Sequence, residues 1–202
     1  MKKLIILAGF MILLSIAVFL VGLTAEYHMK KQDMIRLHVV GASNETYDQQ
    51  IKLLVRDAVL HYMQEDVQTC SNAQQVQEYL LENLDGIEQM ANSVLEESGS
   101  TDCVRISLCK EEFPMRAYDT FSLPSGVYTS LRINIGKAEG KNWWCVVFPS
   151  FCIGASSDAF LDTAAAAGFS QPLRDTLVTQ NRYQIRFFFL DWIGKLENFF
   201  HF

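Results

Sequence analysis

The sequence has 202 residues, of which 50% are hydrophobic and 12% aromatic, and this composition is typical of one medium-sized domain with a core of its own. The 23 acidic and 17 basic side chains give a net charge of −6. Lys and Arg nowhere form a run of more than two residues. Because binding to nucleic acid requires clustered basic groups that neutralise phosphates, the composition argues against a nucleic-acid partner.

The N-terminus carries the strongest signal in the chain. Lys2 and Lys3 precede twenty residues without a charge, Leu4 to Leu23, which as a helix would cover about 30 Å and cross a bilayer. Residues 1–25 are therefore predicted to be a signal peptide, with Ala25 as the small residue at a cleavage site, or a transmembrane anchor. Either way, residues 26–202 are predicted to be exported, with the N-terminus kept in the cytoplasm.

The five cysteines bear on redox chemistry and metal binding. No C-x-x-C is present and the four histidines lack metal-ligand spacing, so neither a metal site nor a cofactor is predicted. Export permits disulfides, and Cys145 and Cys152, with Pro149 between them, form the candidate pair. Cys103 and Cys109 lie on one face of a predicted strand, about 20 Å apart, and cannot bond to each other.

The first half of the exported part alternates strand and helix patterns. Alternation over 34–40 predicts a strand with Arg36 and His38 on one face. Apolar residues spaced three and four apart predict three amphipathic helices. The first covers about 45–62, the second begins at a cap formed by Ser71-Asn72 and ends at Asp85-Gly86, and the third runs from there to Ser98. A second strand is predicted over 102–113, where Pro114 ends it.

The stretch from 123 to 152 is predicted to form a Trp-rich antiparallel hairpin. Residues 127–135 alternate between apolar and polar side chains, and 143–148 is a dense aromatic and β-branched run, with Gly136 and Gly140 in the connecting loop. Adjacent strand residues point to opposite faces, so Trp143 and Trp144 diverge. One is expected in the core; the other is expected to be covered by the chain or by a partner.

The C-terminal segment 183–200 is predicted to be a helix, although 183–189 also fits a strand. Its aromatic stripe is expected to dock on the domain, and membrane-surface binding is disfavoured because basic residues are few. The predicted fold class is α+β, with an N-terminal hydrophobic helix, an antiparallel sheet and a C-terminal helix. The stripe comprises Ile185, Phe188, Phe189, Trp192, Ile193, Leu196, Phe199 and Phe200.

Catalytic chemistry is sparse. Cys145 with His38 is the one combination of nucleophile and base worth considering, and no P-loop, G-x-S-x-G or H-E-x-x-H motif is present. An enzyme is not predicted, and an exported Cys/His hydrolase and a structural envelope protein remain alternatives. Arg36 is predicted to form a structural ion pair with Asp57, with a recognition site as the alternative.

Three segments together resemble the stage II sporulation protein R family: 36–44, RLHVVGASN; 123–128, LPSGVY; and 142–152, which contains Asn-Trp-Trp-Cys. The similarity runs from about residue 34 to the terminal helix. The Asn-Trp-Trp-Cys block is its most specific part, whereas the amphipathic helices are common to many proteins.

The resemblance implies an exported sporulation signalling protein of endospore-forming bacteria. Such proteins are made in the forespore and exported into the septal intermembrane space. There they activate, by binding, a membrane-embedded aspartic protease of the mother cell, which processes the sigma-E precursor. For this chain, the candidate partner-binding residues are Trp143, Trp144, Arg36 and His38.

Overall fold

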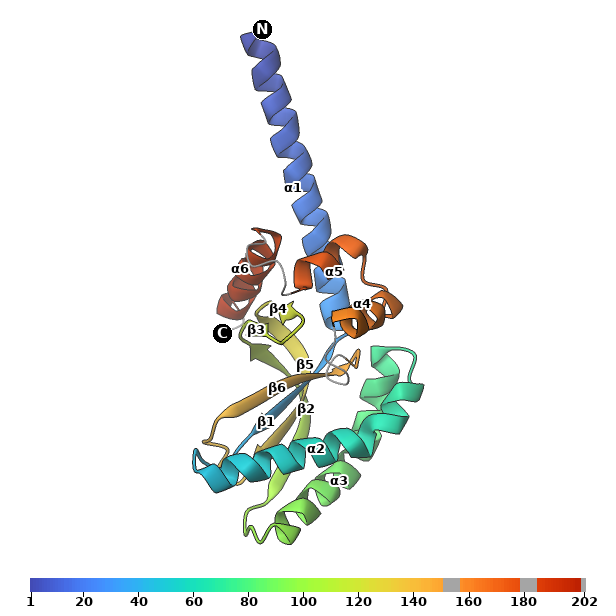
Figure 1. The fold of residues 1–202 in the computed structure, drawn as a ribbon, viewed down its shortest axis with the longest axis vertical. Coiled ribbons are helices and arrows are strands. Elements are labelled where there is room, and N and C mark those ends of the chain that lie inside the picture. Colours follow the sequence, from blue (N-terminus) through green and yellow to red (C-terminus); the bar gives the residue numbers. More distant parts are fainter. Residues whose placement is uncertain (151–156, 179–184, 201–202) are drawn as a thin grey trace.

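The computed structural model describes residues 1–150, 157–178 and 185–200 (Figure 1). The fold class is α+β, as predicted, with a long N-terminal helix, two helices on one face of the main sheet, and three further helices near the base of the first. The main sheet is mixed and not purely antiparallel as expected, because two of its strands run parallel to each other. The helices are α1 (Lys2–Gln32), α2 (Thr46–Thr69), α3 (Ala73–Glu97), α4 (Ser157–Ala166), α5 (Gln171–Leu177) and α6 (Ile185–Phe200).

The main sheet has four strands in the order β2-β5-β1-β6, and β1 and β5 are parallel while the other neighbours are antiparallel. A small separate sheet pairs β3 (Arg116–Ala117) with β4 (Ser122–Leu123). The four main strands are β1 (Ile35–Val40), β2 (Val104–Phe113), β5 (Gly126–Ile135) and β6 (Asn142–Phe148).

The predicted Trp-rich hairpin is wrong in its pairing, because β1 lies between β5 and β6. All six residues of β1 are buried, so this strand occupies a central position with a partner on each side. The connection from β5 to β6 passes over the end of β1, where the N–H of Gly140 donates to the carbonyl of Gly41 at 2.8 Å.

Helices α2 and α3 cover one face of the sheet and form the first core with the odd-numbered residues of β1 and β5. The two helices predicted on either side of Asp85-Gly86 are one continuous helix, α3. A glycine inside a helix costs only about 1 kcal/mol, and the buried stripe continues across it. This stripe comprises Val76, Leu80, Ile87, Ala91 and Leu95.

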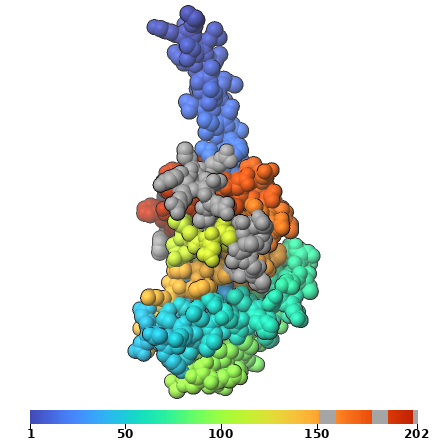
Figure 2. All heavy atoms as spheres, viewed as in Figure 1, coloured from blue at the N-terminus to red at the C-terminus, as the bar shows by residue number. Residues whose placement is uncertain are grey.

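The second core lies on the other face of the sheet, at one end, and includes the last turns of α1. Leu23, Thr24 and Tyr27 are buried there, whereas the preceding turns stand free of the body, as Figure 2 shows. Among the described residues, α1 is the one helix long and apolar enough to cross a membrane. The predicted boundary after residue 25 therefore falls inside a continuous helix.

The C-terminal helix is confirmed from Ile185 onward, while residues 183 and 184 lie outside the described residues. The expected docking of its aromatic stripe on the domain is wrong for Phe188, Trp192, Leu196 and Phe199, which are exposed. Phe188, Trp192 and Phe199 are 65%, 57% and 72% exposed. The helix is buried instead along Leu190, Asp191 and Gly194.

Candidate partner-binding surface

Strand alternation sorts the predicted site residues onto two faces of the sheet. Arg36 and His38 on β1 lie on the face opposite α2, and Trp144 on β6 joins them beside His38. Trp143 lies on the face of α2, where its ring contacts Arg56. The prediction that the two tryptophans diverge is confirmed, and the four candidate residues do not form one patch.

His38 sits in a polar cluster that spans three other residues from three strands. Its Nδ1 lies 3.0 Å from Glu111 Oε2, and its Nε2 lies 3.0 Å from Asn142 Oδ1. Arg132 Nη1 donates to the same Glu111 oxygen at 3.1 Å. The side chains of His38 and Glu111 are only 9% and 13% exposed, so the cluster is largely shielded from water.

Glu111 is the charged centre of this cluster. Burial alone would raise the pKa of its carboxyl, but the hydrogen bond with His38 and the charge of Arg132 lower that pKa overall. The carboxylate is therefore ionised at neutral pH and fixes the orientation of the His38 ring. No pattern along the chain indicates this set, because its members meet only through the register of β1, β2, β5 and β6.

Trp144 belongs to the framework around His38. The two rings stack with centroids 5.4 Å apart and planes 17° apart, and the guanidinium of Arg116 lies 3.5 Å from the Trp144 ring centroid. The indole also packs against the second core. These contacts indicate that Trp144 has mainly a structural role and is not a freely accessible contact residue.

Trp143 is the more accessible of the two tryptophans. Its side chain is 37% exposed on β6, an edge strand of the main sheet, and the Arg56 guanidinium lies 4.2 Å from its ring centroid. Next to Arg56, the carboxylate of Asp57 is 62% exposed. An aromatic ring on an edge strand, with a guanidinium against it and an exposed carboxylate paired with that guanidinium, is a surface suited to protein binding.

Arg36 is fully buried, so it is not an accessible contact residue. Its Nη2 donates to the hydroxyl of Tyr118 at 2.6 Å, and its guanidinium lies 4.2 Å from the ring centroid of Phe113. The predicted ion pair with Asp57 is wrong: Asp57 is on α2, across the sheet, and pairs with the adjacent Arg56 at 2.6 Å. Helix α2 packs on the face of β1 that carries Ile35, Leu37 and Val39, whereas Arg36 lies on the other face.

The sheet also separates Cys145 from His38. Cys145 pairs in register with Leu37 and belongs to the first core, whereas His38 faces the opposite side. The combination of nucleophile and base that the alternative hydrolase would need therefore does not form. Cys152 lies outside the described residues, so its pairing with Cys145 stays a prediction.

The remaining thiols, Cys70, Cys103 and Cys109, are free. The prediction that Cys103 and Cys109 do not form a disulfide with each other is confirmed. Burial, followed by the charge of Glu111, raises the pKa of the Cys109 thiol and makes it a poor nucleophile. No group of three or more His, Cys, Asp or Glu residues within the described parts of the chain is arranged to hold a metal ion.

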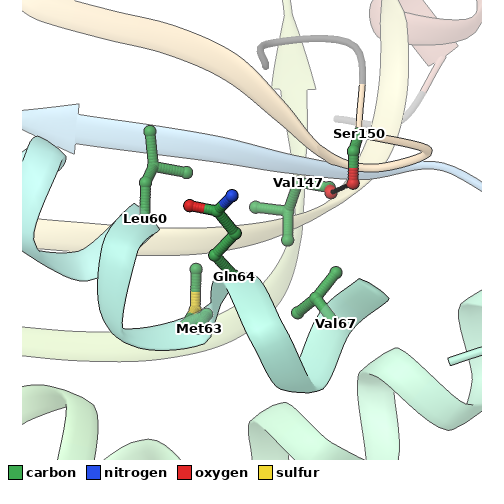
Figure 3. Close-up of a pocket in the computed structure, with 6 residues that line it drawn as sticks. All are labelled: Leu60, Met63, Gln64, Val67, Val147 and Ser150. Carbon is green, nitrogen blue, oxygen red and sulfur yellow. Dashed lines mark hydrogen bonds between the residues drawn. The ribbon is translucent and has the colours of Figure 1, made fainter. Parts of the chain in front are cut away.

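Hollows of very different size lie among the described residues. A small one between α2 and the end of β6 has a volume of about 20 Å³, room for roughly one water molecule (Figure 3). It is lined by Leu60, Met63, Gln64, Val67, Val147 and Ser150. A larger cleft of about 360 Å³ lies between the base of α1, β5 and α6, and carries Lys31, Lys110 and Glu197.

The sheet with α2 and α3 corresponds to a known family. Residues 31–158, well over half of the chain, match the family model of stage II sporulation protein R. The chain belongs to the stage II sporulation protein R family.

A curated member of the stage II sporulation protein R family extends this similarity beyond the matched segment. The chain is 25% identical over 223 aligned positions to stage II sporulation protein R of Bacillus subtilis strain 168, covering 97% of this chain and 99% of that protein. No solved structure matches the chain. The protein is therefore a sporulation protein, and its family is not one of known enzymes.

Proposed function

We propose that this protein is an exported sporulation signal that activates, by binding, a membrane-embedded aspartic protease of the mother cell, which then processes the sigma-E precursor. Membership of the stage II sporulation protein R family carries the proposal. The apolar α1 supports export, with the septal intermembrane space as the site of action. The separation of Cys145 from His38 supports a role in binding and speaks against the exported Cys/His hydrolase.

We infer that α1 is retained as an anchor. Leu23 and Thr24 are buried in the second core, and Glu26 accepts hydrogen bonds from the N–H and hydroxyl of Ser170 at 2.7 and 2.6 Å. Cleavage near Ala25 would cut a continuous helix and remove buried residues from that core. An N-terminal epitope tag tests this: it stays on the exported protein if the anchor is retained, and is lost if the segment is cleaved.

Activation follows from differential affinity. A bound partner shifts an equilibrium between inactive and active arrangements only if it binds the active one more tightly. The surface around Trp143, Arg56 and Asp57 is the proposed contact, because it is accessible and combines an aromatic ring with both charges.

The test is processing of the sigma-E precursor in a sporulating strain that lacks its own copy of this signal. The wild-type chain is expected to restore processing, and Trp143→Ala to be exported normally but inactive. Leu81→Ala is the matched control, since Leu81 is an exposed apolar residue on α3, 59% accessible. Full activity of Trp143→Ala would exclude this contact surface.

A structural envelope protein is the second candidate. Such a protein would show no dependence on any single surface residue, so the absence of processing with the wild-type chain and with both variants, all of them exported, would favour it. A wild-type chain that is exported and restores nothing would overturn the signalling role in that strain.

A further inference from the structure

Helix α6 is docked by its polar side. Asp191 accepts from the N–H of Ser125 at 2.9 Å, and Glu197 pairs with Lys31 of α1. Gly194 lies directly on the Ser125 carbonyl, so close that a Cβ at this position would fall 1.8 Å from that oxygen. These contacts fix the rotation of the helix about its axis.

The opposite side of α6 is an exposed aromatic face. Phe188, Trp192, Leu196 and Phe199 follow one another at spacings of four, four and three residues, which places them on one stripe. Their exposed fractions are 65%, 57%, 37% and 72%. Burial of such side chains normally stabilises a fold, so a contiguous exposed stripe indicates a surface that is covered by something else.

The topology places this face at the end of the body from which α1 leaves. β1 begins directly after α1, and β5 runs parallel to it with Ile35 opposite Thr129, so both strands begin at that end. Ser125, the residue before β5, carries α6. Figure 1 shows α6 beside the base of α1, at the end of the body from which the rest of that helix projects.

We propose that the aromatic face of α6, formed by Phe188, Trp192, Leu196 and Phe199, lies in the interface of the membrane that α1 spans. The face points away from Ser125, because Asp191 and Gly194 on the other side of the helix contact that residue. No flexible linker separates the span from the body, because α1 is one helix from Lys2 to Gln32. Aromatic side chains, Trp above all, favour the boundary between headgroups and acyl chains.

The attraction to lipid is apolar rather than electrostatic. Residues 26–202 carry 15 basic against 23 acidic side chains, and Lys195 of α6, whose side chain is 67% exposed, is already paired with Asp191. A short face of this kind would bind a membrane weakly by itself. Attachment through α1 makes the second contact effectively intramolecular, so weak affinity is sufficient. The inference thus rests on the retained anchor proposed above.

The experiment is quenching of tryptophan fluorescence by lipid. The full chain, purified with α1 intact, is reconstituted into phosphatidylcholine vesicles with and without brominated acyl chains. The chain has three tryptophans; Trp192 is expected to account for most of the quenching. Trp192→Phe should lose most of the quenching. Trp143→Phe, the matched control on β6, should retain it.

Two results would overturn the proposal: no quenching of the wild-type chain, or equal quenching in wild type and Trp192→Phe. Thermal unfolding of Trp192→Phe should match that of wild type, because the side chain is exposed, and this confirms that the variant is folded. The assay contains no protease and no sporulating cell, so its outcome is independent of the signalling role. Loss of precursor processing by Trp192→Phe without lipid quenching would assign this face to a protein partner.

Discussion

The carboxylate of Asp191 and the backbone of Ser125 hold the C-terminal helix on the body. The N–H of Ser125 donates to Asp191 Oδ1 at 2.9 Å, and the hydroxyl of Ser125 lies 2.8 Å from the same oxygen. Asp191 is 5% exposed, so this polar contact is shielded from water. It explains how a helix with an aromatic stripe comes to present that stripe outward.

Asp191→Ala is expected to destabilise the protein by about 1–3 kcal/mol, because the buried N–H of Ser125 loses its acceptor, whereas the Ser125 hydroxyl can still donate to the main-chain oxygen of residue 191. The loss should appear in thermal unfolding of the full chain in phosphatidylcholine nanodiscs. Lys195→Ala is the control: Lys195 pairs with Asp191 at 2.8 Å but its side chain is 67% exposed, so its removal should cost less than about 1 kcal/mol. An equal loss in both variants would contradict this account.

The effect of Asp191 should depend on pH. Burial raises the pKa of this carboxyl, but hydrogen bonds from Lys195 and Ser125 lower it overall. Its stabilisation is therefore complete above the unfolded pKa of about 3.9 and is lost as the pH falls through the lower folded value. Stability curves of wild type and Asp191→Ala should differ at pH 6 and converge in acid. A constant difference down to pH 2 would exclude the ionised contact.

Gly194 and Gly86 allow a matched pair of substitutions inside helices. Gly194→Ala would place a methyl group 1.8 Å from the main-chain oxygen of Ser125 and should displace α6. Gly86→Ala on α3 meets only the hydroxyl of Tyr62 at 3.0 Å, the far end of a side chain that is 44% exposed and can turn away. Alanine there should stabilise the protein by about 0.5–1 kcal/mol. Urea unfolding should give opposite signs; a neutral Gly194→Ala would refute the close approach.

The C-terminal helix shows where prediction from the sequence succeeds and where it stops. Periodicity identified a helix and its apolar stripe, because both depend on residues three and four apart. It placed that stripe against the body, since a soluble helix normally buries it. Which side of the helix faces the body depends instead on the contacts of Gly194 and Asp191 with Ser125. Asp191 and Ser125 are 66 residues apart in the chain, so helix periodicity does not reveal that they meet.

The sheet gives the same lesson for strands. Alternation correctly placed Arg36 and His38 on one face and sent Trp143 and Trp144 to opposite sides, because it depends only on the strand period. Alternation carries no information about which strands are neighbours in the sheet, so it does not predict that β1 lies between β5 and β6. The cluster around His38 forms only because the strands lie in this order, so alternation does not predict it either.

Glu111→Gln tests the cluster around His38. The amide keeps the size of the side chain but loses the charge that pairs with Arg132, so a destabilisation of about 1–3 kcal/mol is expected. The pKa of Glu111 is lowered in the folded state, so this contribution is complete above the unfolded value of about 4.3 and fades as the pH falls through the folded one. Urea unfolding at pH 7 and at pH 3 measures the change. A difference that grows toward acid would contradict the sign.

Tyr27 of α1 and Tyr128 of β5 are joined by a hydrogen bond between their hydroxyls. Replacing each by Phe is expected to destabilise the protein by different amounts. The hydroxyl of Tyr128 donates to the carbonyl of Pro124 at 2.7 Å, so the buried hydroxyl of Tyr27 donates its own proton to Tyr128 Oη. Tyr27→Phe removes one donor and should cost about 1 kcal/mol, whereas Tyr128→Phe leaves two buried groups unpaired and should cost roughly 1–2 kcal/mol more.

Burial raises the pKa of Tyr128 to about 12, so its hydroxyl remains a donor throughout the neutral range. A raised tyrosine pKa means that this stabilisation is complete below the unfolded value of about 10 and is lost as the pH rises through the folded one. Chemical unfolding of the full chain in nanodiscs at pH 7 measures both variants, which differ from wild type by one oxygen each. Equal losses, or a larger loss for Tyr27→Phe, would show that the proton order along this chain of hydroxyls is reversed.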